Sequence, residues 1–173
     1  MNRFKTFIIL LVMLFSSTVV ADDANRRILF SGLSFHEKNY LDDGTKLNKY
    51  NLGLGYERDY FTEYGKLYYT YHTMVLNDSN RNFQIYTAGS KSIRFEKPLN
   101  PWFDVSVGIA GVVSIKKMRQ DDGEYKYKPI AVVAPVSSFY IDNYTLNFSY
   151  IPSYSFTKYN TIGFFYVYFG WQF

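Results

Sequence analysis

Cysteine is absent from the 173-residue sequence, which excludes disulfide bonds, thiolate metal ligands and a lipid-modified cysteine anchor. Histidine occurs only twice, as His36 and His72, so a histidine-rich metal site is not expected. The nucleophile elbow GxSxG and a glycine-rich phosphate loop are both missing. The sequence therefore implies no metal and no cofactor.

An excess of charge of one sign is also missing. Lysine and arginine number 19 against 15 acidic residues, a net charge of +4. Loss of Arg3 and Lys5 with an N-terminal leader would leave 17 against 15, close to +2. This balance is too weak to indicate a nucleic-acid partner.

Long apolar runs are confined to the N-terminus. Arg3 and Lys5 precede an apolar run from Phe7 to Phe15, which small residues and Val19-Val20-Ala21 follow. This order is typical of a secretory signal peptide over residues 1–21, with the mature chain starting near Asp22. No later segment approaches the roughly 18 apolar residues of a transmembrane helix, so a membrane-spanning domain over 22–173 would consist of strands.

Aromatic residues, by contrast, are abundant: 18 Tyr, 16 Phe and 2 Trp. The last nine residues, 165–173, alternate large apolar side chains with others and end on Phe173. Such a closing strand is typical of a bacterial outer-membrane β-barrel, which carries aromatic girdles at both lipid–water interfaces. A soluble lipid-binding barrel is an alternative, and it predicts polar outward positions on the last strand.

Period-two alternation predicts an all-β fold, an eight-stranded antiparallel transmembrane β-barrel. The expected strands are 27–38, 46–57, 64–76, 83–96, 102–117, 126–139, 143–152 and 161–173. Short turns are expected at 57–63, 97–101 and 141–143, and longer polar loops at 39–46, 77–82, 117–125 and 153–160. With an even strand count both termini lie in the periplasm, so the polar loops would be extracellular.

The side chains of two strands can be assigned to faces from the alternation. In the last strand Phe165, Val167, Phe169 and Trp171 would face lipid, and Phe164, Tyr166 and Tyr168 the lumen. In the first strand the expected outward set is Leu29, Leu33 and Phe35, and the inward set is Phe30, Gly32, Ser34 and His36. A lumen of rings and small residues suits one acyl chain better than an ion.

The candidate chemical residues are His36 and the segment Asn77-Asp78-Ser79-Asn80, expected at the same end of the barrel. An imidazole can take a proton from a hydroxyl while a carboxylate fixes its tautomer. The same four-residue segment is also an ordinary turn sequence. A non-enzymatic structural or adhesive barrel therefore stays open. It predicts a lumen packed with side chains that leaves no acyl-sized cavity, and a His36 too far from Ser79 for contact.

Several segments resemble the PagP family of outer-membrane lipid A palmitoyltransferases. They are Leu33-Ser-Phe-His36, Met74-Val-Leu-Asn-Asp-Ser-Asn-Arg-Asn82, Tyr127-Lys-Pro-Ile-Ala-Val-Val-Ala-Pro-Val-Ser-Ser, Phe148-Ser-Tyr-Ile-Pro152 and Gln172-Phe173. The resemblance implies transfer of a palmitoyl-like chain from the sn-1 position of a phospholipid to lipid A. It carries the family's catalytic residues to His36, Asp78 and Ser79, and two prolines that flank a lateral opening to Pro135 and Pro152.

The sequence also departs from the family pattern. Only residues 22–26 precede the first strand, so the family's N-terminal amphipathic helix is absent or very short. Ser31 and Tyr50-Asn51 stand where prolines flank a second lateral opening. The glycine at the floor of the family's acyl pocket falls within Ala88-Gly89-Ser90-Lys91.

The resulting expectation is an acyltransferase of the bacterial outer membrane, exported by its signal peptide and working as a monomer or homodimer. Its partners would be a phospholipid donor and a lipid A acceptor. Basic residues expected in the outer loops, Arg81, Lys116 and Lys117, could contact lipid A phosphates or simply form a solvated rim.

Overall fold

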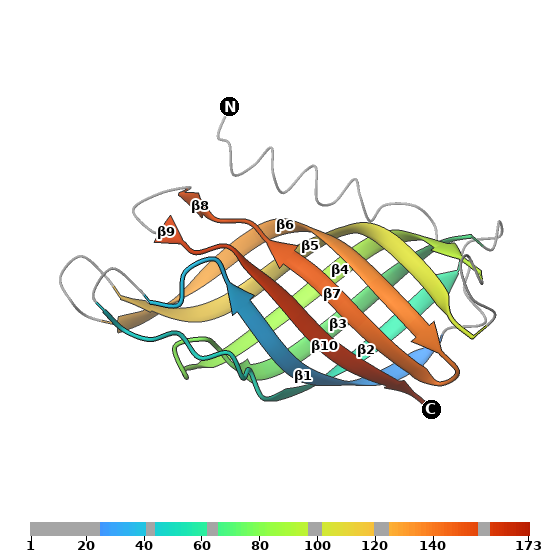
Figure 1. The fold of residues 1–173 in the computed structure, drawn as a ribbon, viewed down its shortest axis with the longest axis horizontal. Coiled ribbons are helices and arrows are strands. Elements are labelled where there is room, and N and C mark those ends of the chain that lie inside the picture. The colour runs from blue at the N-terminus through green and yellow to red at the C-terminus, as the bar shows by residue number, and fades with distance from the viewer. Residues whose placement is uncertain (1–24, 41–43, 62–65, 97–101, 120–124, 156–159) are drawn as a thin grey trace.

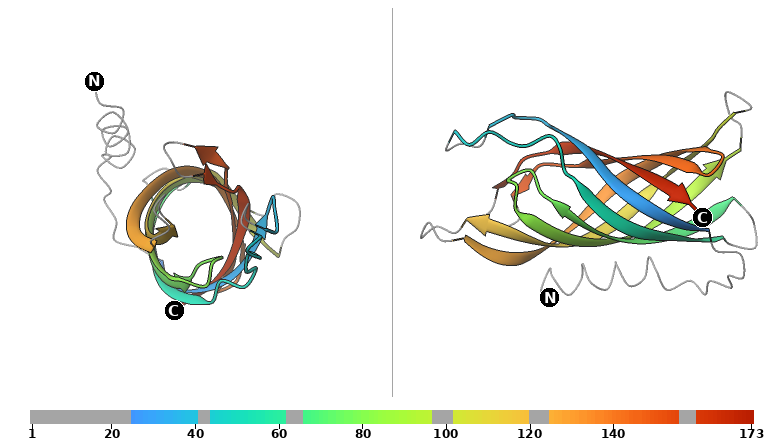
Figure 2. Two further views of the ribbon diagram at one scale, coloured as in Figure 1. Left: turned by 90° about the vertical axis from the view of Figure 1, so that its left-hand side faces the viewer. Right: turned by 90° about the horizontal axis from the view of Figure 1, so that it is seen from below.

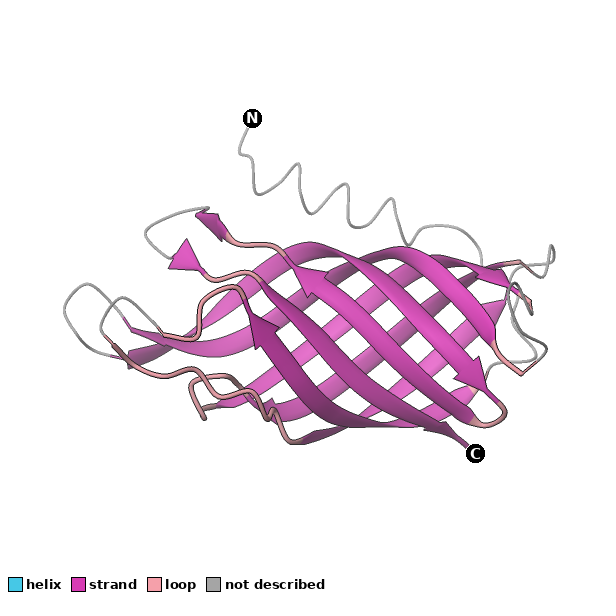
Figure 3. Ribbon diagram, in the orientation of Figure 1, coloured by secondary structure: helices cyan, strands magenta, loops and turns pink. Residues whose placement is uncertain are grey.

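The computed structural model describes residues 25–40, 44–61, 66–96, 102–119, 125–155 and 160–173. The predicted signal peptide, residues 1–21, and the predicted turn 97–101 lie outside the described residues. Within the described ranges the chain forms ten strands and no helix (Figure 3). The strands are β1 (Arg26–His36), β2 (Gly53–Phe61), β3 (Leu67–Asn77), β4 (Phe83–Phe95), β5 (Asp104–Arg119), β6 (Tyr125–Ile141), β7 (Tyr144–Ile151), β8 (Tyr154–Ser155), β9 (Asn160–Thr161) and β10 (Phe164–Gln172).

Eight of these strands close a barrel in the order β1-β10-β7-β6-β5-β4-β3-β2, and β8 pairs only with β9. Each neighbouring pair is antiparallel, and β10 closes the ring against β1 from Arg27↔Gln172 to His36↔Phe164. Figure 1 shows the tilted strands from the side, and the end-on view in Figure 2 shows the ring. The predicted eight-stranded antiparallel barrel is confirmed. We call the end that holds Arg26 and Gln172 the inner end, and the end that holds His36 the outer end.

No helix in the described part of the chain is long and apolar enough to cross a membrane.

The second strand differs most from its prediction. It was expected over 46–57 but begins at Gly53 and continues to Phe61. Glu57 and Asp59 resemble turn residues in the sequence, yet both side chains are buried in the lumen, where they pair with Arg27. Residues 46–52 run beside β1 without a regular ladder, with one bridge from Tyr50 to Leu33.

A bulge in β1 explains why the predicted inward and outward sides of this strand are correct for only part of it. The register with β10 shifts between Ser31 and Leu33, so the alternation changes phase at Gly32. Leu29 is therefore buried inside and Phe30 is exposed outside, opposite to the prediction, whereas Ser34 is buried as expected. A Cβ on Gly32 would lie 2.6 Å from the Val167 carbonyl oxygen, so only glycine fits this close approach.

The outer face of the barrel is broadly apolar. On β10, Phe165 is 55%, Phe169 38% and Trp171 40% exposed, while Tyr166 and Tyr168 are buried inside. This matches the predicted facing of the last strand and contradicts the polar outward positions of a soluble barrel. Exposed apolar area of this extent around a whole barrel marks a surface that faces lipid.

The lumen is layered along the barrel axis. A charged cluster around Arg27 fills the inner end, and the small polar residues near His36 lie at the outer end. Between them lies a buried cluster made of Leu29, Met74, Leu76, Tyr86, Tyr166 and Tyr168, with Val112 and Phe164 packed against it. The prediction of a partly apolar interior holds for this middle layer.

The seam between β6 and β7 is incomplete at the outer end. These strands pair only from Val136↔Ser149 to Ile141↔Tyr144. β6 continues outward from Pro135 to Tyr125 with β5 as its partner, and β7 ends at Ile151, just before Pro152. Proline donates no ladder hydrogen bond, so Pro135 and Pro152 stand where the pairing stops.

Candidate active site

His36 and Ser79 are in direct contact at the outer end. The bulge-corrected alternation of β1 turns His36 inward at its last residue, and Ser79 follows the end of β3 by two residues. His36 Nε2 lies 2.7 Å from Ser79 Oγ. Ser79 is 7% exposed, so its hydroxyl is sheltered from bulk water. The non-enzymatic alternative predicted that these side chains lie too far apart for contact, and this distance contradicts that part of it.

The His36 ring packs against Phe164 of β10, with ring centroids 5.5 Å apart. Its other nitrogen, Nδ1, is buried and has no hydrogen-bond partner among the described residues. When Nδ1 carries the proton, Nε2 is free to accept the hydrogen bond from the Ser79 hydroxyl. That tautomer is the one in which the imidazole can take a proton from an oxygen.

Asp78 organises the loop that carries Ser79. Its Oδ1 accepts hydrogen bonds of 2.8 Å from the backbone amides of Asn80 and Asn82. The Arg81 amide donates to the Asp78 carbonyl at 2.8 Å, and Arg81 takes a left-handed conformation with φ 62°. The side chain of Asp78 is 1% exposed. The carboxylate thus fixes the turn directly after Ser79.

The second oxygen of Asp78 points elsewhere. Asp78 Oδ2 lies 3.5 Å from Lys116 Nζ on β5 and accepts no hydrogen bond in the described part of the chain. Among these residues no hydrogen bond joins Asp78 to His36, since His36 Nδ1 and Asp78 Oδ2 both lack one. Lys116 and Lys117 lie near the outer end of β5, as the strand expected over 102–117 implies.

Two polar residues near Ser79 were not predicted from the sequence. Asn51 Nδ2 donates to Ser79 Oγ at 3.5 Å, and Ser34 Oγ donates to Asn51 Oδ1 at 2.6 Å. The Asn48 amide donates to the Ser79 carbonyl at 2.7 Å. Ser34 could have been found, because it stands two residues before His36 on the same face of its strand. Asn51 could not, because its position depends on the irregular course of residues 46–52.

The same segment closes the seam where the family has its second opening. Ser31 Oγ donates to the Asn51 carbonyl, and the Asn51 amide donates to the Gly32 carbonyl at 3.0 Å. The Ser34 amide donates to the Lys49 carbonyl at 2.8 Å. Hydrogen bonds thus join β1 to residues 49–51 where the regular ladder has ended.

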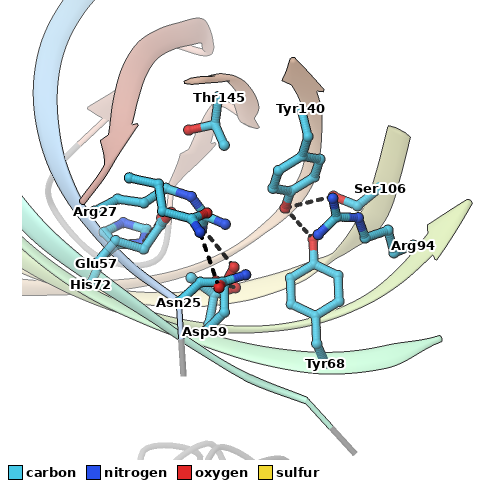
Figure 4. Close-up of polar contacts among 12 residues, drawn as sticks. Asn25, Arg27, Glu57, Asp59, Tyr68, His72, Arg94, Ser106, Tyr140 and Thr145 are labelled. Atoms are coloured by element: carbon cyan, nitrogen blue, oxygen red, sulfur yellow. Dashed lines mark hydrogen bonds and ion pairs between the residues drawn. The ribbon is translucent and has the colours of Figure 1, made fainter. Parts of the chain in front are cut away.

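The charged cluster at the inner end was not predicted either (Figure 4). Arg27 Nη1 lies 2.9 Å from Glu57 Oε1 and 2.6 Å from Asp59 Oδ2, and all three side chains are buried. His72 Nδ1 lies 3.6 Å from Glu57 Oε2. The hydroxyl of Tyr140, whose ring lies under Arg27, is 2.6 Å from the Tyr68 hydroxyl. These contacts close the lumen far from Ser79, so His72 belongs to the inner end and not to the candidate site.

The burial pattern of β4 shows which of its side chains point into the lumen. Ala88 is 2% exposed and pairs with His72 and Val112 on the neighbouring strands. Because side chains alternate along a strand, Ala88 and Ser90 face the lumen and Gly89 faces outward. Ala88 and Ser90 are therefore the inward residues of the segment that holds the floor position.

No group of three or more histidine, aspartate or glutamate side chains within the described ranges could hold a metal ion.

Comparison with known families gives one match. Residues 17–170 match the family described as "Antimicrobial peptide resistance and lipid A acylation protein PagP". The match covers nearly all of the barrel. A comparison with curated proteins finds no match.

Among solved structures, the similar ones include Ail, an outer membrane protein of Yersinia pestis. Its backbone structure in a phospholipid bilayer nanodisc has a TM-score of 0.43 at 13% identity, covering 87% of this chain and all of that one. Its crystal structure has a TM-score of 0.43 at 14% identity, and its complex with the heparin analogue sucrose octasulfate has 0.40 at 14%. Each of these two covers 87% of this chain and 97% of that one.

Proposed function

The chain belongs to the PagP family of lipid A acylation proteins, and from that membership we propose that it transfers a palmitoyl-like acyl chain from the sn-1 position of a phospholipid to lipid A. The reaction takes place in the outer membrane, and the signal peptide 1–21 exports the chain. The observation that carries the proposal is the 2.7 Å contact between His36 Nε2 and Ser79 Oγ at the outer end of a lipid-facing barrel. An imidazole and a hydroxyl at hydrogen-bonding distance are what acyl transfer between oxygens requires.

In this proposal His36 is the general base. It accepts a proton as a hydroxyl attacks the ester carbonyl of the donor, and it returns the proton to the glycerol oxygen that leaves as lysophospholipid. The attacking hydroxyl is either Ser79, which would form an acyl-enzyme that lipid A then cleaves, or the lipid A hydroxyl itself. In the second case Ser79 and the Asn51 amide hydrogen-bond to the reacting oxygens. The mass of the intact protein after incubation with donor alone distinguishes the two, because only the first adds an acyl group.

Asp78 acts through the loop in this scheme. Its hydrogen bonds to the amides of Asn80 and Asn82 hold Ser79 beside His36. The negative charge of the carboxylate, next to Ser79 in the chain, also favours the imidazolium that forms when His36 takes the proton.

The gap between β6 and β7 is the proposed entry for the phospholipid. β6 carries no β7 partner outward of Val136, so the barrel wall there lacks its ladder hydrogen bonds. An acyl chain that enters from the bilayer reaches the outer lumen without crossing a paired seam. The hydrogen bonds between β1 and residues 49–51 argue against a second opening there, which favours one entry for both lipids.

The apolar middle layer is the proposed environment of the acyl chain. Its side chains lie between the His36–Ser79 pair and the charged cluster, which would stop the chain because a hydrocarbon cannot solvate ions. Ala88 and Ser90 are the inward residues of the segment in which the family's floor glycine falls. Either side chain is larger than that of glycine and would shorten the space for the acyl chain, so the transferred chain is expected to be no longer than palmitoyl.

The direct test is transfer by the purified protein in micelles that contain phospholipid and lipid A. His36→Gln and Ser79→Ala should each lower the transfer rate by about 10²- to 10⁴-fold, the usual contribution of a general base or its partner. Ser153→Ala, an exposed serine at the same end, is the matched control and should keep the parent rate. Full activity of folded Ser79→Ala and His36→Gln proteins would refute the assigned roles.

A further inference from the structure

The outer ends of β5 and β6 bring lysines together on the lumen side of the open seam. Lys116 and Lys128 are directly opposite each other in the register of this pair. On β6 the buried residues Val132 and Ala134 define the inward face, and alternation places Lys128 and Lys126 on that same face. Lys116, Lys126 and Lys128 therefore share the lumen face of this two-stranded extension.

This arrangement has an electrostatic consequence. Like charges directly opposite each other on antiparallel strands destabilise the pair, because their side chains are only about 5 Å apart at Cβ. Lys116 pairs with Asp78, which lies 3.5 Å away. Lys128 is half-buried and Lys126 exposed, so both are accessible from the rim. An anion bound on this face would be attracted by all three ammonium groups.

The place of the lysines identifies the class of anion. Lys126 and Lys128 stand on the part of β6 that has no β7 partner, beside the proposed entry for lipid, and Lys116 lies opposite Lys128 on β5. Asp78, the partner of Lys116, directly precedes Ser79 in the chain. Lys116 thus contacts the loop that carries Ser79. Ammonium groups at a membrane surface bind lipid phosphates through charge-assisted hydrogen bonds.

We infer that Lys116, Lys126 and Lys128 form a binding site for the phosphate of a lipid headgroup at the β6 edge of the lateral gap. The inference rests on the proposed function, since it assigns the site a lipid substrate. The phosphate belongs to the phospholipid donor or to lipid A. It anchors the headgroup at the rim while the ester or the acceptor hydroxyl reaches His36 and Ser79.

The test is a binding measurement that needs no turnover, so it can succeed or fail independently of catalysis. The Ser79→Ala protein, isotope-labelled for NMR and held in phosphate-free detergent micelles, is titrated with four lipids. They are short-chain phosphatidylethanolamine, short-chain diacylglycerol, lipid A and dephosphorylated lipid A. In this background Lys126→Gln with Lys128→Gln should raise the Kd of a phosphorylated lipid by about tenfold, the worth of one charge-assisted hydrogen bond. The Kd of its phosphate-free counterpart should not change.

Matched variants sharpen the test. Lys38→Gln with Lys46→Gln removes the same charge from exposed positions of the first outer loop and should change each Kd by less than about twofold. Lys126→Arg with Lys128→Arg should restore binding. A loss seen only with phosphatidylethanolamine assigns the phosphate to the donor, and one seen only with lipid A assigns it to the acceptor. Equal losses for phosphorylated and phosphate-free lipids, or no loss at all, would overturn the inference.

Discussion

The carboxylate of Asp78 illustrates how a single side chain can serve two tasks. One oxygen accepts two backbone hydrogen bonds of the loop, and the other faces Lys116. The first task needs an acceptor, whereas the second needs a negative charge. These tasks can be separated by substitution because an amide keeps an acceptor oxygen and loses the charge.

Asp78→Asn and Asp78→Ala are therefore expected to differ. The asparagine variant can keep the loop hydrogen bonds and should retain the folded position of Ser79, with a rate loss that reflects charge alone. The alanine variant leaves the amides of Asn80 and Asn82 without their acceptor, at a cost of about 1–3 kcal/mol in local stability. Amide hydrogen exchange at residues 80 and 82 measures the loop, and transfer rates measure the chemistry. Exchange at these amides in Asp78→Ala as slow as in the parent protein would show that Asp78 does not hold the loop.

At the scale of elements, the incomplete seam between β6 and β7 is the feature that links fold to function. The seam is paired from Val136 to Ile141 and unpaired beyond Pro135. If the ladder continued outward, Ala134 would stand opposite Ile151. A lipid that enters through this gap must pass between these two positions.

Cross-linking across the gap should therefore stop acyl transfer. The chain has no cysteine of its own, so Ala134→Cys with Ile151→Cys introduces a defined thiol pair. A disulfide or a short bis-thiol reagent between them should abolish transfer, and reduction of the disulfide should restore it. Ser138→Cys with Asn147→Cys, a pair that is already opposite in the register, is the matched control and should stay active when cross-linked. Unimpaired transfer by the Ala134–Ile151 cross-linked protein would exclude entry at this seam.

The strands also differ in how well the sequence pattern predicts which side chains face the lumen. On β10 one face meets lipid and the other the lumen, so period-two alternation predicted its facing correctly. On β1 a bulge at Gly32 changed the phase, and a bulge leaves no periodic signal. On β2 the run Glu57-Arg58-Asp59 suggested a turn, because the sequence alone does not reveal that Arg27 pairs with both acids inside the barrel.

The whole molecule is organised as a polar, apolar and polar stack along the axis. The stability of the inner end depends strongly on charge pairing, because Arg27, Glu57 and Asp59 are almost fully shielded from water. The removal of one partner leaves buried charges without compensation. Stability of the inner end should therefore depend on Arg27 more than on any exposed arginine.

Arg27→Met is expected to lower the free energy of unfolding by about 3–5 kcal/mol, because Glu57 and Asp59 lose their shared cation. Arg26→Met changes the neighbouring exposed arginine and should alter stability by about 0.5 kcal/mol at most. The triple variant with Glu57→Gln and Asp59→Asn should recover part of the loss. Urea unfolding in detergent micelles measures all three. A triple variant less stable than Arg27→Met alone would contradict this explanation.

The candidate site could be predicted only in part, because some of its contacts depend on how distant segments of the chain lie together in the fold. His36, Asp78 and Ser79 carry chemistry that is visible in residue types and in the family resemblance. Asn51 and Ser34 act through hydrogen bonds that exist only once residues 46–52 lie along β1. The proposed phosphate site on β5 and β6 could not be predicted, because it depends on the register of these strands and on the gap beside them. Both are properties of the folded barrel.

The most direct measurement of the central claim is the lipid A mass spectrum of a Gram-negative host that lacks its own palmitoyltransferase and expresses this chain. We predict a new lipid A species heavier by one acyl group, absent when a correctly inserted Ser79→Ala variant is expressed, and its mass gives the length of the transferred chain. An unchanged spectrum from correctly inserted parent protein would contradict acyl transfer to lipid A.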